Sequence, residues 1–330
     1  MTIKYILRKK KSGYHSVEKL YYSVGSEIKK NLLVKFIEAP FESRGLFRRI
    51  ANILYFSKSD SKEILHITGD INYIAINRSK NIVLTILDFV MLEKLSGFKR
   101  LLYLLFWVWL PVHFSKVVIV LSEKIKNDLM ELANVEENKI KVIPVPVSEI
   151  MVKSHKILNK SRPAILMVGT AWNKNLHRCI EALENLNCTA IILGNLSQED
   201  ISKLNEMKIY YTNFVDIAEE EVYLKYVEAD ILLYPSLYEG FGMPIIEANS
   251  VGRPVVTSNI SPMIDIANHS ACLVNPMCVQ EIRHGLLKVI NQDNYRIELI
   301  NKGYENAKKY KLNAITNKYK NVYNEILSEN

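Results

Sequence analysis

The sequence predicts an α/β protein built from two Rossmann-like domains, each a doubly wound parallel sheet. Apolar runs of strand length alternate with segments of helical periodicity along most of the chain. This alternation occurs twice, on either side of the polar, lysine-rich segment 148–163. A length of 330 residues allows two domains that each bury a core. We therefore expect one domain over residues 1–150 and a second over 151–311.

The first half contains six apolar runs that predict strands, at 3–8, 30–39, 63–70, 81–89, 117–122 and 139–147. Helical periodicity between them predicts helices at about 15–24, 41–57, 101–112 and 124–133. The run over 101–112 is interrupted by Pro111 and is too short for a membrane span, so we expect a buried helix there.

The second half repeats the pattern, with strands expected at 164–170, 189–195, 209–211 and 229–236 and one more ending at Val256. Helices are expected at 175–186, 197–207 and 219–228, after Pro244, and over much of the polar segment from 280 onward. Ligands of such sheets bind beyond the carboxyl ends of the strands. The segments that follow 164–170 and 229–236 are therefore the first candidates for a site.

The composition is that of a soluble globular protein, with 48% hydrophobic and 24% charged residues. The cysteines lack C-x-x-C spacing and no histidine cluster accompanies them, so we expect reduced core cysteines in a cytosolic protein, and no metal site. The apolar segment at the N-terminus is too short for a signal peptide. No long apolar run predicts a membrane span.

The charge is unevenly distributed. Residues 1–150 hold 24 lysines and arginines against 15 aspartates and glutamates, whereas the rest of the chain holds 19 against 20. The whole net charge of +8 thus lies in the first half. Such a field favours anionic partners such as acidic lipid, pyrophosphate-linked carriers or nucleic acid.

Two segments of the basic half carry apolar and basic residues together. Over 41–57, apolar residues recur at helical spacing beside Arg44, Arg48 and Arg49. This helix could lie on an anionic membrane surface, or it could pack on the sheet with its arginines in water. Trp107 and Trp109, close to Lys99 and Arg100, leave the same two interpretations open for the second segment.

The stretch 229–256 has the order strand, glycine-rich loop, short helix and strand. Gly240 and Gly242 allow a sharp turn and a close approach of a ligand to the backbone. Pro244 is expected at the first helical position, with Glu239 before the helix and Glu247 in its first turn. Free amides at such a helix start bind anions such as a diphosphate, and carboxylates beside them accept hydrogen bonds from sugar hydroxyls. Without further information, a purely structural interpretation fits equally well: the glycines would only form a turn, and Glu247 would only interact favourably with the helix dipole.

The same stretch closely resembles the donor-binding signature of retaining GT-B glycosyltransferases of glycosyltransferase family 4. The matching residues are Glu239, Gly240, Phe241, Gly242, Met243, Pro244, Glu247, Gly252, Pro254, Val255 and Val256. The resemblance implies that Glu239 contacts donor-sugar hydroxyls and that the amides of Phe241, Gly242 and Met243 lie near sugar and phosphate. Glu247 would hold the ribose of a nucleotide.

The segment after the strand 164–170 resembles the phosphate loop of the same family. It places Gly169, Thr170, Lys174 and Asn175 at the donor, with Lys174 neutralising the diphosphate. The family commonly has an arginine where this chain has Thr170, so Lys174 would act alone or with help from Arg178 or from a lysine of the first domain. In the first domain, the resemblance implies that Gly13 lies in the loop that faces the donor phosphates, and a solvated basic loop is the alternative.

Weaker matches lie elsewhere. Leu87-Asp88 stands where the family often has His-Asp, which makes Asp88 a catalytic candidate beside Glu239 and Lys174. His66, Gly69 and Asp70 resemble a segment of polysaccharide-building members, although a lone histidine here is more often a core residue. Ser122-Glu123 matches a strand-to-helix turn of the family, and Asp265 replaces its glutamate further on.

The resemblance implies a retaining glycosyltransferase of GT-B fold, with its two domains facing a central cleft. It would move a sugar from a nucleoside diphosphate sugar to a hydroxyl of a glycan or lipid-linked acceptor in lipopolysaccharide, O-antigen or capsule biosynthesis, with no metal or other cofactor. The first domain would bind the acceptor and the second the donor, and the last helix, about 312–330, would cross back to the first. We expect a cytoplasmic enzyme, peripheral on the inner face of the cytoplasmic membrane.

Two other classes of function stay open. Leu87 and Thr170 depart from the family pattern and are compatible with a non-catalytic, glycosyltransferase-like partner subunit. The basic half alone would suit nucleic acid, but it lacks a recognition motif or an aromatic–basic stacking pattern, so no nucleic-acid partner is expected. Nicotinamide chemistry is disfavoured because no G-x-G-x-x-G follows the first strand.

Overall fold

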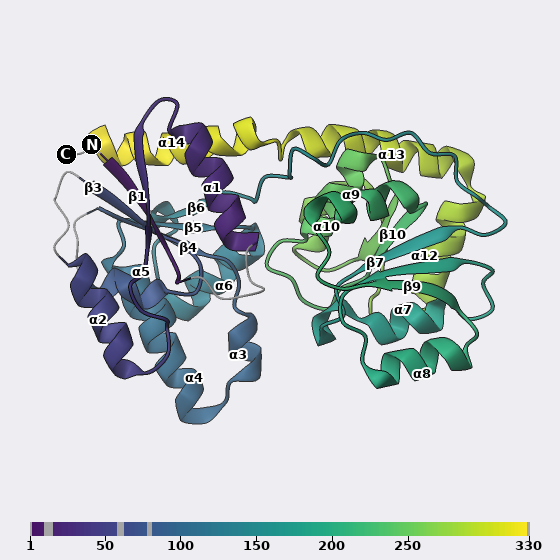
Figure 1. Ribbon diagram of the computed structural model, residues 1–330, viewed down its shortest axis with the longest axis horizontal. Coiled ribbons are helices and arrows are strands. Elements are labelled where there is room, and N and C mark those ends of the chain that lie inside the picture. The colour runs from purple at the N-terminus through teal and green to yellow at the C-terminus, as the bar shows by residue number, and fades with distance from the viewer. Residues whose placement is uncertain (1, 10–15, 58–62, 78–80, 329–330) are drawn as a thin grey trace. The chain divides into compact units, whose positions relative to one another are not determined.

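The computed structural model describes residues 2–9, 16–57, 63–77 and 81–328. The chain divides into two compact units, unit 1 with Met1–Pro146 and Leu312–Asn330, and unit 2 with Val147–Lys311. Each unit contains one six-stranded sheet whose paired strands are parallel (Figure 1). The predicted α/β class with two Rossmann-like parallel sheets is confirmed. Gly13 lies outside the described residues.

The strands of unit 1 are β1 Thr2–Leu7, β2 Leu33–Glu38, β3 Glu63–Ile67, β4 Ile82–Ile86, β5 Val117–Val120 and β6 Ile140–Val142. They lie in the order β2-β1-β3-β4-β5-β6. Each corresponds to an apolar run of the first half. The strand order changes direction between β1 and β3.

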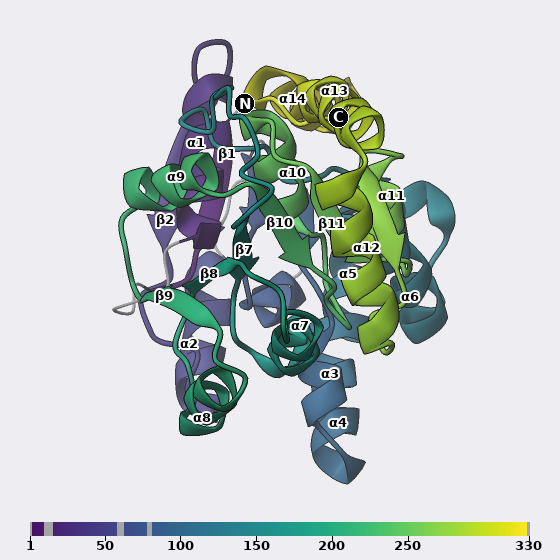
Figure 2. The same cartoon turned by 90° about the vertical axis from the view of Figure 1, so that its right-hand side faces the viewer.

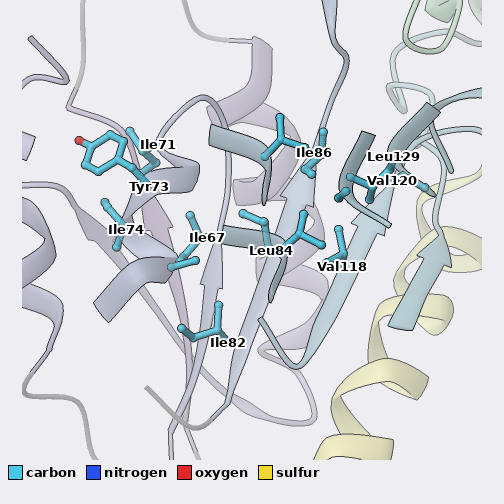
Figure 3. Packing of buried hydrophobic residues seen from close by; sticks show 14 of the residues in the cluster. Ile67, Ile71, Tyr73, Ile74, Ile82, Leu84, Ile86, Val118, Val120 and Leu129 are labelled. Atoms are coloured by element: carbon cyan, nitrogen blue, oxygen red, sulfur yellow. The ribbon is translucent and has the colours of Figure 1, made fainter. Parts of the chain in front are cut away.

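One face of this sheet is covered by α1 Ser16–Ile28 and α14 Leu312–Ser328. The other face carries α2 Leu46–Phe56, η1 Asn72–Asn77, α3 Val90–Lys94, α4 Gly97–Tyr103, η2 Leu104–Trp109, α5 Leu110–Phe114, α6 Glu123–Ala133 and η3 Glu137–Lys139. Figure 3 shows the core on this second face, which contains Ile67, Leu84 and Val118 of the strands and Leu129 of α6.

His66 of β3 lies in the core under α14. Its Nδ1 is 2.6 Å from Tyr323 Oη and its Nε2 is 2.7 Å from Thr85 Oγ1, and the side chain is fully buried. Burial lowers the pKa of His66 to about 3, so the ring is neutral. His66 is therefore a core residue that joins α14 to the sheet.

The helical segment 97–114 is continuous through Pro111 because its backbone groups find other partners. A proline cannot donate to the carbonyl four residues earlier, here that of Trp107. The buried Asn72 side chain supplies the missing donor, with Nδ2 at 2.9 Å from the Trp107 oxygen. The turn before the proline is widened to a π-helix, η2.

The expectation of a buried helix at 101–112 was wrong for one of its faces. Val108, Pro111 and Val112 are buried against the core, whereas five apolar residues on the other side are exposed: Leu101, Leu102, Leu105, Phe106 and Trp109. Hydrophobicity alone does not distinguish a helix buried all round from one with an uncovered apolar face.

The strands of unit 2 are β7 Ala164–Val168, β8 Thr189–Leu193, β9 Tyr210–Phe214, β10 Ile231–Tyr234, β11 Val255–Ser258 and β12 Ala271–Val274. Their order is β12-β11-β10-β7-β8-β9. No run had predicted β12, whose four residues lie between short turns. The strand order reverses between β7 and β10, which are the two strands whose following loops were the first candidates for a site.

The helices of unit 2 are η4 Trp172–Lys174, α7 Leu176–Ala182, α8 Gln198–Glu206, α9 Glu219–Glu228, α10 Met243–Val251, α11 Met263–Ala267, α12 Val279–Asn291 and α13 Asp293–Lys308. The helices α7, α8 and α12 cover one face of the sheet and α9 and α10 the other, while α13 packs on both α10 and α12 (Figures 1 and 2). Because α10 begins at Met243, Pro244 is its second residue, and Glu247 lies beyond the first turn where it had been expected.

Candidate active site

The candidate site lies at the carboxyl edge of the unit 2 sheet, at the strand-order reversal between β7 and β10. The loop after β7 spans 169–175 and the loop after β10 spans 235–242. Both predicted signatures thus lead away from adjacent strands, which are paired in parallel. Parallel strands bring the two loops to the same edge although they are far apart in sequence.

Two buried asparagines join these loops. The backbone oxygen of Asn173 accepts a hydrogen bond from Leu237 N at 2.7 Å, and its Nδ2 donates to Tyr238 O at 2.8 Å. Asn175 Nδ2 donates to Pro235 O at 3.0 Å and to Pro276 O at 2.6 Å. The Asn175 amide, predicted to contact the donor, is thus engaged with backbone carbonyls that hold three loops together.

A cluster of Lys174, Tyr234 and Glu239, here called the Lys174 cluster, occupies the centre of this edge. Lys174 Nζ donates to Tyr234 Oη at 2.7 Å and to Glu239 Oε1 at 2.6 Å, and Tyr234 Oη donates to the same carboxylate oxygen at 2.6 Å. The side chains of Lys174 and Glu239 keep 22% and 12% of their exposure, so both reach solvent. Burial and the neighbouring carboxylate raise the pKa of Tyr234 well above its usual value, which keeps its hydroxyl a donor.

The path of the Lys174 side chain explains the glycine at position 169. Gly169 has φ +86°, and a Cβ built on it would lie 3.0 Å from both Cγ and Cε of Lys174. The aliphatic part of Lys174 thus crosses directly over this glycine. The neighbouring Thr170 hydroxyl donates a hydrogen bond to Asn195 O at 2.6 Å. Thr170 therefore fastens its own loop to the segment that contains Asn195, and it does not perform the role of the arginine that the family commonly has at this position.

The loop that follows Glu239 ends at the N-terminus of α10. Gly242 precedes the helix with φ +112°, and the buried Phe241 ring packs edge-on against Tyr310 at 5.7 Å between centroids. Within the described part of the chain, no residue accepts a hydrogen bond from the backbone N–H groups of Phe241, Gly242 or Met243. These amides and the positive end of the helix dipole suit an anion.

Glu247 projects from the second turn of the same helix and is held by Tyr226 of α9. Tyr226 Oη donates to Glu247 Oε2 at 2.6 Å, and Tyr226 is fully buried. Among the described residues, none donates to the other carboxylate oxygen, Oε1. Burial raises the pKa of Glu247, with the Tyr226 hydrogen bond acting in the opposite direction. One oxygen is fixed and the other is available to a hydroxyl.

The remaining candidate lies in unit 1. Asp88 is exposed just after β4, and its Oδ1 accepts a hydrogen bond from Val90 N at 3.0 Å at the start of α3. The structure therefore gives Asp88 a local role at a helix start. Asp70, which belongs to the segment that resembles polysaccharide-building members of the family, lies 3.6 Å from the Arg8 guanidinium and so forms an ion pair within unit 1.

Sequence reasoning missed Tyr234 and Tyr226, the two tyrosines that orient the glutamates. A signal existed for Tyr234, because a tyrosine at the end of a buried strand brings a hydroxyl to the edge where ligands bind. Tyr226 had none, since its partner lies 21 residues away on another helix.

Across the parts of the chain that the structure describes, no group of three or more His, Cys, Asp and Glu side chains could hold a metal ion. In the same residues, no helix is long and apolar enough to cross a bilayer.

Residues 151–306 match the family model for glycosyl transferases group 1. Over 190 residues the chain is 30% identical to the O-antigen chain mannosyltransferase RfbU of Salmonella typhimurium, a match that covers 55% of this chain and 53% of that protein. The chain thus spans about half the length of this curated relative.

Solved structures resemble the chain over nearly its whole length. Alr3699/HepE of Anabaena, crystallised with UDP and glucose, has a TM-score of 0.79 at 16% identity and covers 98% of this chain and 100% of its own. WaaG, a glycosyltransferase involved in lipopolysaccharide biosynthesis, has a TM-score of 0.71 at 16% identity over 98% and 99% of the two chains. Residues 151–306 therefore form a group 1 glycosyl transferase domain, on a chain whose fold is that of the GT-B glycosyltransferases.

Proposed function

We propose that this protein is a retaining glycosyltransferase that moves a sugar from a nucleoside diphosphate sugar to a hydroxyl of a glycan or lipid-linked acceptor. The observation that carries the proposal is the Lys174 cluster, which stands at the strand-order reversal of unit 2 together with the N-terminus of α10. The Lys174 ammonium and the free backbone amides at the start of α10 would bind a diphosphate there, and the carboxylates of Glu239 and Glu247 lie beside them.

Each group has a proposed role. Lys174 and the amides of Phe241, Gly242 and Met243 stabilise the diphosphate as it leaves. Glu239 positions sugar hydroxyls, and Glu247 accepts hydrogen bonds from the ribose through Oε1. The acceptor oxygen bonds to the anomeric carbon on the same face from which the diphosphate leaves, as the bond between that carbon and the phosphate oxygen breaks, and the departing phosphate takes the proton of the acceptor hydroxyl. This course requires no protein nucleophile and no metal. The anomeric configuration of the donor is then kept.

The acceptor is proposed to be a surface polysaccharide or its lipid-linked precursor, handled at the cytoplasmic face of the membrane. RfbU is an O-antigen chain mannosyltransferase, and CapM of Staphylococcus aureus, 23% identical over 72% of this chain, is a capsular polysaccharide biosynthesis glycosyltransferase. The basic unit 1 suits an acceptor that carries pyrophosphate.

A donor screen tests this proposal. The purified protein is mixed with UDP-, GDP- and dTDP-sugars, and thermal unfolding and release of the nucleoside diphosphate are followed. At a concentration of about 100 Kd, the right donor stabilises unit 2 by about 2.7 kcal/mol and raises its melting temperature. Glu239→Ala should lose turnover but keep the fold. A protein that no donor stabilises, or that releases nucleotide equally with Glu239→Ala, would be a non-catalytic subunit instead, and inversion of the product anomer would reject retention.

The donor affinity should depend on pH through Glu247. Because burial raises the pKa of Glu247, acidification protonates this carboxyl at a higher pH than an ordinary glutamate, and the ribose loses its acceptor. Nucleotide-sugar affinity should therefore be full above the raised pKa and fall as the pH is lowered through it. Calorimetric titration with the donor found in the screen measures this. Glu247→Gln should bind more weakly at neutral pH and show no such fall, whereas an unchanged pH profile in this variant would contradict the assignment.

A further inference from the structure

Helix α2 presents apolar side chains outward and a polar one inward. Leu46, Phe47 and Leu54 are 67%, 88% and 61% exposed. On the inner side, Asn52 is fully buried. Its side-chain amide forms hydrogen bonds with the backbone of Phe41 and with the hydroxyl of Tyr73. An ordinary surface helix turns its apolar face to the core, and α2 does this with Ile53 and Phe56, but it leaves the further apolar side chains uncovered.

The α4–η2 segment shows the same feature. Phe98, Leu101 and Trp109 are 72%, 61% and 43% exposed, and Leu105 lies between them at helical spacing with 38% exposure. These four positions recur at helical spacing and form a single stripe along the segment. Together with α2, they are named here the two-helix surface, which consists of Leu46, Phe47, Ile50, Leu54, Phe98, Leu101, Leu105 and Trp109.

The two helices are held together within unit 1. The Arg49 guanidinium of α2 lies 4.5 Å above the Trp107 ring of η2. Trp107 in turn packs on Tyr73 of η1 with 5.3 Å between ring centroids, and Tyr73 bonds Asn52 of α2. Figure 1 shows α2 and α4 on the same side of the unit 1 sheet. The uncovered apolar residues therefore belong to two helices that are joined through Tyr73 and Trp107.

Cationic side chains accompany both helices. Arg44 and Arg48 are exposed at and beside α2, and Lys94, Lys99 and Arg100 are exposed at and before α4. Within the described residues, no ion pair involves the side chains of Arg48, Lys99 or Arg100. Apolar side chains beside such free cations suit a surface that offers both hydrocarbon and negative charge.

We infer that the two-helix surface docks on an anionic phospholipid bilayer, with its apolar side chains in the headgroup region and its basic residues on lipid phosphates. A second copy of this chain fits less well, because a two-fold contact would bring the same cations face to face. The docking is peripheral, since no described helix can cross a bilayer. It is independent of the sugar-transfer reaction, because no residue of the Lys174 cluster takes part.

Sedimentation with vesicles tests this docking. The protein should bind vesicles of phosphatidylcholine with phosphatidylglycerol, bind phosphatidylcholine alone at least about ten-fold more weakly, and be released by salt. Phe47→Ser with Phe98→Ser should reduce binding at least about ten-fold, and Arg48→Gln with Lys99→Gln should weaken the salt dependence. The matched controls are Ile157→Ser, an apolar residue of unit 2 that is 84% exposed, and Lys318→Gln, an exposed lysine on α14. Both should bind like the unchanged protein.

Sedimentation velocity of the same proteins without lipid completes the experiment. Absence of vesicle binding, or equal binding by the Phe47/Phe98 variant and the controls, would overturn the inference. A dimer that the Phe47/Phe98 variant abolishes would show that a second copy covers the surface, and would overturn it too. Donor hydrolysis in solution should be the same in all variants, so a failed docking test would leave the proposed reaction untouched.

Discussion

Replacement of Lys174 by alanine is expected to lower the rate of sugar transfer by about 10²–10³-fold while the fold persists, because removing one preorganised group that stabilises developing charge has effects of this size. Lys174 is the cation of the Lys174 cluster, 2.6 Å from Glu239 Oε1. In the proposed reaction the leaving diphosphate gains charge where this ammonium lies. Thr170, which stands where the family commonly has an arginine, offers no charge, so little compensation is expected.

Steady-state kinetics with the donor from the screen measures the effect. Lys203→Ala is a matched control, because Lys203 is 20% exposed against 22% for Lys174 and also pairs with a glutamate, Glu181, outside the site. The control should keep its turnover. Tyr234→Phe should lie between the two, because it removes the hydroxyl that orients both Lys174 and Glu239. A Lys174→Ala enzyme as active as the Lys203→Ala control would remove Lys174 from the mechanism.

Replacement of Gly252 by alanine is expected to destabilise unit 2 by about 2–5 kcal/mol, the sum of a left-handed backbone cost and overpacking. Gly252 ends α10, the helix that carries Glu247, with φ +87°. A Cβ on it would lie 1.9 Å from the Tyr304 hydroxyl oxygen and 2.5 Å from the ring carbon that bears it. Either the Tyr304 side chain or the end of α10 must therefore shift.

Thermal unfolding should show a melting temperature lower by about 2–4 °C per kcal/mol for a unit of this size. The test of the cause is Gly252→Ala in a Tyr304→Ala background, where the clash is gone and only the left-handed cost of about 1–2 kcal/mol remains. If the substitution costs the same in both backgrounds, the clash contributes nothing and the close packing of Tyr304 is not what requires a glycine.

Several features could be predicted from the sequence because they depend on neighbours along the chain. Buried parallel strands appear as continuous apolar runs, so five of the six strands of unit 2 were expected, whereas the four residues of β12 formed too short a run. The glycine at 242 and the helix after it follow from local backbone requirements. The predicted start of α10, at Pro244, was one residue too late. The helix begins at Met243, so Glu247 lies beyond its first turn.

The sequence by itself determined the two parallel sheets and the loops that hold Lys174 and Glu239, since both follow from patterns that span a few residues. Only the tertiary structure decided that Tyr234 joins these two side chains, which lie 65 residues apart, because strand order sets which loops meet. It also decided that α2 and α4 leave apolar side chains uncovered. A hydrophobic pattern records which residues avoid water, but the surface that covers them depends on every other element of the fold.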